Sequence, residues 1–164
     1  MTVADRIGVM NAGHLAQVAT PAEIYEQPGS RWIADFIGDV NLIEGWLVAT
    51  GADGTAIESA AGGRLRVAQA VDAAAGANLW VALRPEKVQI AAQAPAASGE
   101  NCFAGRVLDV GYLGDVSVYK VRLDNGLSMK ATVANRTRLI ARPIGGDDRV
   151  WLSWPPEAGV VLTR

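Results

Sequence analysis

The chain has 164 residues and a formal net charge of −2; 50% of its residues are hydrophobic and 20% are charged. This composition is typical of a globular domain and argues against intrinsic disorder. The apolar runs are far shorter than the roughly 18 to 20 residues that cross a bilayer, and no secretory signal is visible. Cys102 is the single cysteine, which excludes an internal disulfide and a cysteine-built zinc site. We therefore expect a cytosolic protein.

Charge is distributed unevenly along the chain. Residues 1–60 hold two basic and eight acidic residues, whereas residues 101–142 hold seven basic and three acidic ones. Such segregation is typical of ordinary solvated faces, and also of complementary surfaces for a partner or a second copy. The basic residues do not form the dense stripe that nucleic-acid binding requires, so we expect no nucleic-acid partner.

The first forty residues predict a hairpin and a first short helix. Residues 5–10 and 14–19 alternate in polarity and are joined by Asn11-Ala12-Gly13, a turn that tolerates positive φ. Thr20 and Glu23 have the spacing of a capping box around a proline in the first helical turn. The helix that they begin is short, because Pro28-Gly29 follows.

A second helix is predicted over residues 31–37. Ser30 is its N-cap, and Gly38 is placed to end it in the left-handed conformation. Its large apolar side chains share one face at helical spacing; they are Trp32, Ile33, Phe36 and Ile37.

From residue 41 onward the polarity pattern changes to a period of two. Short apolar runs recur between Gly, Asn, Asp or Pro residues, which is typical of a small barrel or sandwich. Asp124-Asn125-Gly126 gives the clearest hairpin signal. Residues 91–101 are small and polar and predict a linker between two halves, 42–92 and 101–164, of about five strands each. No convincing internal repeat is visible in the sequence.

The motifs that support catalysis are missing from this sequence. It contains no phosphate-binding loop, no dinucleotide fingerprint and no nucleophile elbow. His14, the single histidine, follows a turn, where we expect it to be exposed. Asp147 and Asp148 lie in a glycine-rich loop that offers too few ligands for calcium. We therefore predict no catalytic, cofactor-binding or metal-binding residues in this chain.

Two stretches are candidates for a ligand or partner surface. Arg84 and Glu86 stand where an apolar strand ends, and they form either a structural ion pair or a ligand contact. The other stretch is a turn between two strands, which is either a tight turn or a small-ligand or partner surface on a rigid barrel. Its candidate residues are Tyr112, Gly114, Asp115, Ser117 and Tyr119.

These segments together resemble a known family. The stretch from "ADRIGVMNAGHLAQVATPAEIYEQPGS" to "RWIADFIGDVNLIEG" is similar to the end of the nucleotide-binding domain of ABC importer ATPases. The later stretches "LRPEKVQI", "GRVLDVGYLGDVSVYKVRL" and "VANR" resemble the TOBE regulatory module of the same proteins. The turn "YLGD" and the ending "VWLSW…GVVLT" are most similar to ATP-binding subunits of putrescine/spermidine importers.

The resemblance implies a mainly β fold. Residues 1–40 are then a hairpin and two short helices left over from an α/β ATPase core, and residues 41–164 are an OB-like, TOBE/MOP-type β-barrel module. The family's phosphate loop, signature motif and switch histidine lie upstream of this sequence, so we expect a C-terminal piece that does not hydrolyse ATP. ATP and Mg²⁺ are expected only in the full-length parent. We expect residues 1–40 to fold onto the β module, to pair with a second copy, or to be disordered.

The resemblance also implies partners and a location. We expect a homodimer through the β domain, permease subunits as partners of the full-length parent, and a cytoplasmic position peripheral to the inner membrane. The leading hypothesis is a non-catalytic regulatory and dimerisation domain of a polyamine importer. The alternative is an oxyanion-type sensor, to which Arg84, Ser117 and the turn 111–117 would contribute donors.

Overall fold

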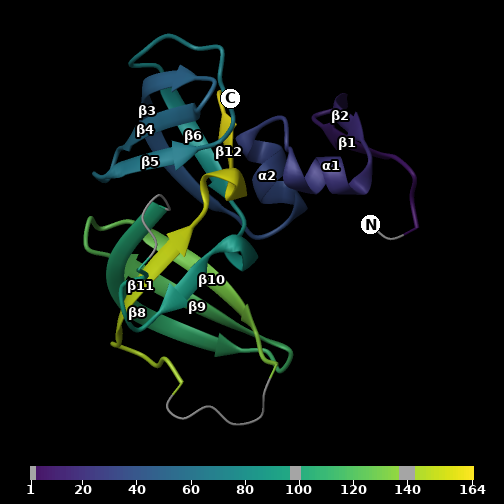
Figure 1. Cartoon of the computed structure of the whole chain (residues 1–164). Coiled ribbons are helices and arrows are strands. Elements are labelled where there is room, and N and C mark those ends of the chain that lie inside the picture. Colours follow the sequence, from purple (N-terminus) through teal and green to yellow (C-terminus); the bar gives the residue numbers. More distant parts are fainter. Residues whose placement is uncertain (1–2, 97–100, 137–142) are drawn as a thin grey trace.

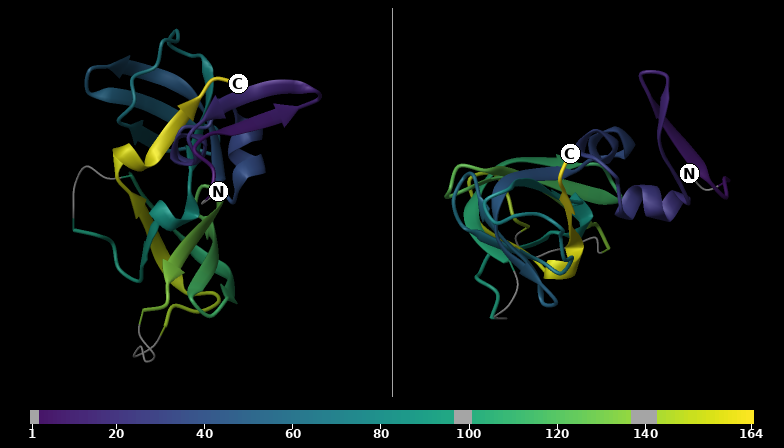
Figure 2. Two further views of the ribbon diagram at one scale, coloured as in Figure 1. Left: turned by 90° about the vertical axis from the view of Figure 1, so that its right-hand side faces the viewer. Right: turned by 90° about the horizontal axis from the view of Figure 1, so that it is seen from above.

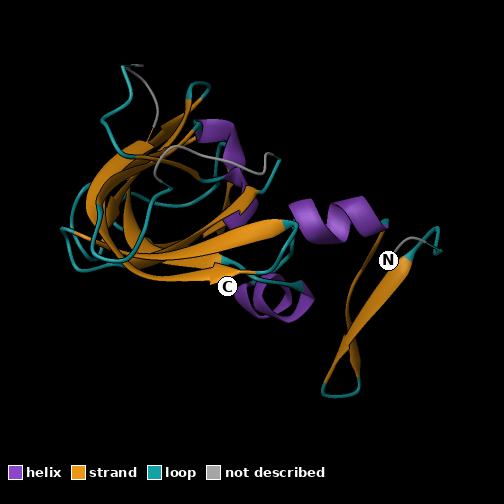
Figure 3. Ribbon diagram, turned by 90° about the horizontal axis from the view of Figure 1, so that it is seen from below, coloured by secondary structure: helices purple, strands orange, loops and turns teal. Residues whose placement is uncertain are grey.

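The computed structural model describes residues 3–96, 101–136 and 143–164. They form a hairpin, two short helices and two five-stranded antiparallel sheets that curl around a shared core (Figure 1). The predicted mainly β, OB-like fold with two short helices is thus confirmed. Figure 3 shows the curled sheets on one side and the hairpin well apart from them, with the helices between.

The hairpin pairs β1 (Ile7–Asn11) with β2 (His14–Ala19), as the sequence predicts. Ala12 and Gly13 both have positive φ, 48° and 80°, which is the two-residue turn whose twist matches that of paired strands. His14 is exposed beside this turn. The hairpin projects from the body of the molecule (Figure 2).

The two helices begin where the sequence predicts. In α1 (Pro21–Glu26) the Thr20 hydroxyl accepts from the Glu23 N–H, and the Glu23 carboxylate accepts from the Thr20 N–H at 2.9 Å. In α2 (Arg31–Ile37) the Ser30 hydroxyl caps the Ile33 N–H. Each helix is therefore fixed by its own first-turn side chains.

The end of α2 differs from the prediction. Gly38 has φ 170° and ψ 177°, so the left-handed cap expected there is wrong. The chain leaves the helix in an extended conformation, because a buried arginine of the β module, Arg84, donates to the carbonyls at this end of the helix in place of a left-handed cap. The predicted apolar face is also divided: Ile33 is buried, whereas Trp32 and Phe36 are exposed and stack with ring centroids 4.9 Å apart.

Ten strands form the two sheets. The first sheet has the order β12-β6-β3-β4-β5, and the second has the order β10-β9-β8-β11-β7. The strands of the first are β3 (Asn41–Gly51), β4 (Gly54–Ser59), β5 (Arg64–Val67), β6 (Asn78–Leu83) and β12 (Gly159–Leu162). Those of the second are β7 (Gln89–Ala91), β8 (Asn101–Tyr112), β9 (Val116–Leu123), β10 (Ser128–Ala134) and β11 (Arg149–Trp154). Single 3₁₀ turns, η1 (Pro85–Lys87) and η2 (Pro156–Ala158), follow β6 and β11.

The sheets are related by an internal repeat that the sequence analysis did not detect. The chain repeats a segment of five strands, β3–β7 and then β8–β12. The first four strands of each segment lie in one sheet, in the order fourth, first, second, third. The fifth strand crosses to the other sheet and pairs with the fourth strand there, β7 with β11 and β12 with β6. The registers correspond, because Asn41 pairs with Leu83 as Asn101 pairs with Trp154. Few identities mark this repeat, mainly an Asn-x-x-x-Gly pattern that begins β3 and β8.

One apolar core lies between the two sheets. It includes buried side chains of both, among them Ile57 and Leu79 of the first sheet and Val107 and Leu152 of the second. The chain also links the sheets directly, because β7 follows β6 of the first sheet but pairs in the second, and β12 follows β11 of the second sheet but pairs in the first. The two sheets therefore form a single unit, called here the β module (residues 41–164).

Candidate functional site

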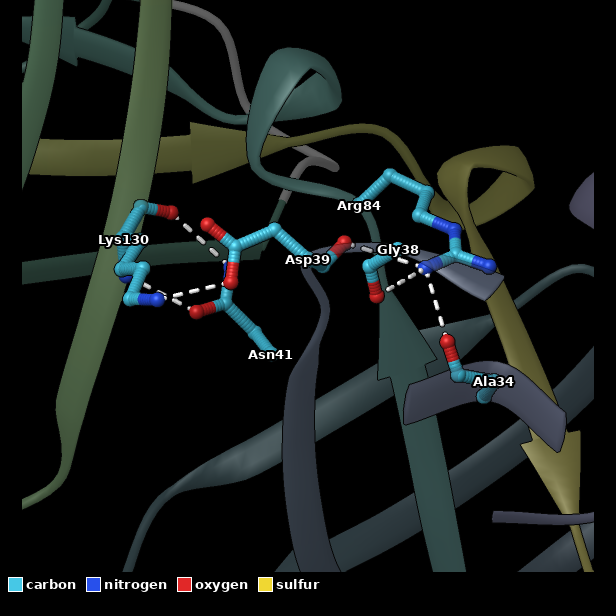
Figure 4. A network of polar contacts seen from close by, with 6 residues as sticks. All are labelled: Ala34, Gly38, Asp39, Asn41, Arg84 and Lys130. Atoms are coloured by element: carbon cyan, nitrogen blue, oxygen red, sulfur yellow. Dashed lines mark hydrogen bonds and ion pairs between the residues drawn. The ribbon is translucent and has the colours of Figure 1, made fainter. Parts of the chain in front are cut away.

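The most elaborate polar site joins the helices to the β module. Arg84 follows β6, and only 5% of its surface is exposed. Its guanidinium donates to the carbonyl oxygens of Ala34 (3.0 Å), Gly38 (2.9 Å), Asp39 (3.0 Å) and Tyr25 (3.2 Å). Figure 4 shows Arg84 directed at the end of α2. Carbonyls at a helix C-terminus lack helical partners, so the cation satisfies groups that burial would otherwise penalise.

Tyr25 of α1 completes this junction. The Arg84 guanidinium lies 4.2 Å from the centroid of the Tyr25 ring, and the Tyr25 hydroxyl donates to Glu86 Oε1 at 2.5 Å. Burial, and then the hydrogen bond to Glu86, raise the pKa of Tyr25 to about 12. Among the described residues, Arg84 and Glu86 do not form an ion pair with each other. Arg84 donates to helix carbonyls such as that of Ala34, and Glu86 accepts from the Tyr25 hydroxyl.

Further contacts surround this pair. Lys87 forms an ion pair with Glu26, and Lys130 Nζ lies 2.7 Å from Asp39 Oδ1. Arg31 lies over the Trp80 ring, 4.4 Å from its centroid. We call residues 20–40 the helical segment and its contacts with Arg84, Glu86, Lys87 and Lys130 the junction. Strand β6 and the turn η1 that follows it, together with β10 of the other sheet, thus hold the helical segment against the β module.

Two buried asparagines at equivalent positions bridge the sheets. Asn41 donates to the Lys130 carbonyl at 2.9 Å and accepts from the Lys130 N–H at 2.8 Å (Figure 4). Asn101 makes the same pair of bonds with Arg66, at 2.9 and 2.7 Å. Each asparagine side chain therefore bonds to the open edge of a strand as a residue of a neighbouring strand would. Asn41 bonds in this way to the edge of β10, and Asn101 to the edge of β5. Sequence reasoning missed both, although their shared Asn-x-x-x-Gly pattern was a detectable signal.

The predicted turn residues lie at the tip of the β8–β9 hairpin. Gly114 has φ 93°, which the turn requires, and Tyr112 is exposed. Ser117 is buried and donates to Asn135 Oδ1 at 2.8 Å, while the Asn135 amide donates to the Gly114 carbonyl at 3.0 Å. Asn135, which no sequence motif marks, thus fixes the turn to the end of β10.

The candidate residues do not converge on one site. Arg84 and Glu86 belong to the junction, and within the described part of the chain the Arg84 side chain bonds to the helical segment alone. Tyr119 packs against the apolar core, and Asp115 is exposed, with its carbonyl accepting from the Asn135 N–H. The two stretches singled out in the sequence therefore belong to two separate features of the structure, the junction and the β8–β9 turn.

A shallow groove of about 710 Å³ runs between the end of α1 and β12. Its charged lining residues are Glu26, Lys87 and Glu157, and none of the predicted site residues lines it.

Within residues 3–96, 101–136 and 143–164, no group of His, Cys, Asp or Glu side chains is arranged to hold a metal ion. In the same ranges no helix is long and apolar enough to cross a membrane.

The curled sheets, exchanged last strands and docked helical segment define a small β-barrel module with two helices packed against it. Residues 81–162 match the TOBE domain family, so the chain belongs to that family. It is 37% identical over 162 residues to the spermidine/putrescine import ATP-binding protein PotA of Nitrosomonas eutropha, covering 99% of this chain and 45% of that protein. It is 41% identical over 165 residues to the putrescine transport ATP-binding protein PotG of Escherichia coli K12, covering 99% and 43%. The resemblance drawn from the sequence is thereby confirmed.

The matches fall on the C-terminal part of these relatives. The chain spans less than half the length of the curated relatives it matches. Among solved structures, the cytoplasmic molybdate-binding protein ModG superposes with a TM-score of 0.63 at 13% identity, covering 84% of this chain and 99% of that one. At this identity the likeness shows the fold.

Proposed function

We propose that this chain is a non-catalytic regulatory and dimerisation domain of the ATP-binding subunit of an ABC importer, and that the importer carries polyamines such as putrescine or spermidine. The observation that carries this proposal is the match of nearly the whole chain to PotA and PotG proteins, with the TOBE domain over residues 81–162. ATP and Mg²⁺ are then bound by the remainder of a full-length subunit. Its partners are membrane permease subunits, and its location is the cytoplasmic face of the inner membrane.

The junction supports a regulatory role. Arg84 bonds to main-chain atoms of both helices, so a displacement of the β module displaces the helical segment with it. In the longer relatives this segment follows the part of the chain that precedes the match, and there we place ATP binding. A signal received by the β module, or by its copy in a dimer, is thereby transmitted along the helical segment.

A segment exchange tests the transport role. The C-terminal part of E. coli PotG that matches this chain is replaced by this chain, and putrescine uptake is measured in cells that lack PotG. We expect uptake well above that of PotG truncated before the matched part. Uptake equal to that of the truncated protein would contradict the proposal. Arg84→Ala in the chimera is expected to give uptake between the two levels, provided that immunoblots show equal amounts.

Sedimentation equilibrium of the purified chain tests dimerisation. We expect a concentration-dependent monomer–dimer equilibrium, and a monomer at all concentrations would contradict that part of the proposal.

A thermal-shift assay with ATP and Mg²⁺ tests the non-catalytic assignment. We expect no shift, whereas a ligand at 100 times its Kd stabilises by about 2.7 kcal/mol and is easily detected.

The oxyanion sensor stays the second candidate, favoured by the ModG-like fold. Arg84 is a poor ligand for it, because its guanidinium already donates to four carbonyl oxygens. Calorimetric titration with molybdate and sulfate would support this candidate if either bound with saturable affinity.

A further inference from the structure

A row of three arginines crosses the outer face of the second sheet. The strand register places Arg149 opposite Arg106, and Arg106 opposite Arg122. All three are exposed, and we call them the arginine row. Lys120 lies on the same face, two residues before Arg122. Like charges directly opposite each other destabilise a strand pair, so the row costs stability unless an anion neutralises it.

Contacts within the chain neutralise the arginine row only in part. Asp124 binds Arg149 with both carboxylate oxygens, at 2.7 and 2.5 Å. Arg106 donates to the main-chain carbonyl of Asp147, which leaves its charge uncompensated. Arg122 has no ion pair with any described residue. Positive potential therefore remains around Arg106 and Arg122.

The fold itself does not require this row. By the internal repeat, Arg149, Arg106 and Arg122 correspond to Asn78, Trp46 and Glu58, which face one another in the same way across the first sheet. Glu58 is paired there with Arg64 at 3.7 Å. The same three positions thus tolerate neutral and acidic side chains, and the arginines of the second sheet need a separate explanation.

We propose that the arginine row binds an acidic segment of a partner polypeptide. Neighbouring strands lie about 4.8 Å apart, so three arginines across three strands span about 10 Å. Carboxylates on successive turns of a helix cover a similar length, because two turns rise about 10.8 Å. Guanidinium groups bind carboxylates through two parallel hydrogen bonds, as Arg149 already does with Asp124.

A short acidic segment fits this chain better than a nucleic acid does. The net charge of −2 repels a long polyanion, whereas a short segment experiences mainly the local positive potential. Nucleic-acid binding to an OB-like surface also relies on exposed aromatic side chains beside the basic residues. The register neighbours of the row include Ala104 and Ser128. A single aromatic side chain, Trp151, adjoins the row in the strand register of the described residues; it is half-buried, and Arg149 lies over its ring, 5.9 Å from the centroid.

Fluorescence anisotropy of the full chain with a labelled deca-glutamate peptide tests this proposal. We expect binding that weakens as salt rises, and no binding of deca-glutamine. Arg122→Gln should weaken deca-glutamate binding about 2- to 5-fold, and Arg106→Gln combined with it should weaken binding further. Arg66→Gln is the matched control, because Arg66 is exposed on the first sheet and the charge change is the same. We expect Arg66→Gln to leave binding unchanged.

Several results would overturn the proposal. Equal weakening by Arg66→Gln would show that overall charge acts rather than the row, and absence of binding at low salt would exclude an acidic occupant. Tighter, Arg122-dependent binding of a ten-nucleotide single-stranded DNA would assign the row to nucleic acid. A dimer in sedimentation that Arg122→Gln dissociates would assign it to a second copy. Circular dichroism checks that each variant is folded.

Discussion

The guanidinium of Arg84 and the ring of Tyr25 lie face to face, 4.2 Å apart, at the point where the helical segment meets the β module. The hydroxyl of the same tyrosine bonds to Glu86, so two residues that flank Pro85 hold both the face and the tip of one α1 side chain. In the internal repeat the equivalent of Arg84 is Pro155, which precedes η2. The arginine is thus specific to the half of the module that carries the helices.

Arg84→Ala should destabilise the chain. The substitution removes charged hydrogen bonds from carbonyls at the end of α2 and leaves a cavity beside Tyr25. Hydrogen bonds to charged groups contribute about 1.5 to 3 kcal/mol each when buried, so we expect a loss of about 3 kcal/mol in the free energy of unfolding. Urea denaturation measures this loss, and hydrogen exchange should show reduced protection in residues 20–40.

The control for this prediction is Arg66→Ala, an exposed arginine for which we expect a change within about 0.5 kcal/mol. Arg84→Lys should fall between the two, because one ammonium group cannot reach carbonyls on both helices. Unchanged protection of residues 20–40 in Arg84→Ala would contradict the assigned role of Arg84.

Local sequence signals predicted the hairpin and the helical segment well, because the residues that form each signal lie within four residues of one another. The Thr20–Glu23 capping box and the turn at Ala12-Gly13 are of this kind. Arg84 could not be assigned in this way, since its acceptors lie 45 to 59 residues away and are main-chain atoms that carry no sequence signal. The left-handed cap predicted at Gly38 was wrong for the same reason. Arg84, 46 residues further along the chain, donates to the Gly38 carbonyl in place of that cap.

The strand pattern was likewise visible in the sequence, but the sheet to which each strand belongs was not. Both β7 and β12 follow a 3₁₀ turn that carries the chain to the other sheet, and the turns share only Pro-Glu. Period-two alternation reports which side of a strand is buried, not which strand it pairs with. The repeat therefore became evident only from the registers.

Asn41→Ala and Asn101→Ala should each destabilise the module by about 2 kcal/mol. Each substitution leaves a main-chain N–H and a carbonyl of the neighbouring edge strand without its partner. Asn101→Asp is informative, because a carboxylate still accepts from the Arg66 N–H but cannot donate to its carbonyl. We expect Asn101→Asp to be no more stable than Asn101→Ala. Thermal unfolding measures both, and wild-type stability of either alanine variant would contradict the bridging role.

Gly45 and Gly105 should not tolerate a side chain. They occupy equivalent positions of the repeat, and an added Cβ would lie 2.4 Å from the carbonyl oxygen of Glu58 or Arg122. Neither strand can move without disturbing the core, so we expect Gly→Ala to cost about 3 kcal/mol at each position. Gly111→Ala is the matched control in β8, because its nearest neighbour would lie at 3.9 Å. Equal stability of the Gly105 and Gly111 variants in urea would contradict this prediction.

Stability at alkaline pH should depend on Tyr25. Folding raises the pKa of Tyr25 from about 10 in the unfolded chain to about 12, through burial first and then the hydrogen bond to Glu86. The folded state therefore holds this proton more tightly, so the contribution of Tyr25 is complete below about pH 10 and is lost as the pH rises through about 12. Tyrosinate absorbance should show a late component near pH 12 in the wild type, and Tyr25→Phe should remove it.

Glu86→Gln separates the two causes of this shift. It removes the carboxylate and leaves the tyrosine as buried as before, so we expect the late component to move to lower pH without reaching the value of an exposed tyrosine. A titration of Tyr25→Phe that keeps the late component would show that another tyrosine produces it. A Glu86→Gln titration identical to that of the wild type would show that the carboxylate does not bind the hydroxyl in solution, and the contact of Glu86 with α1 would then not hold the helical segment.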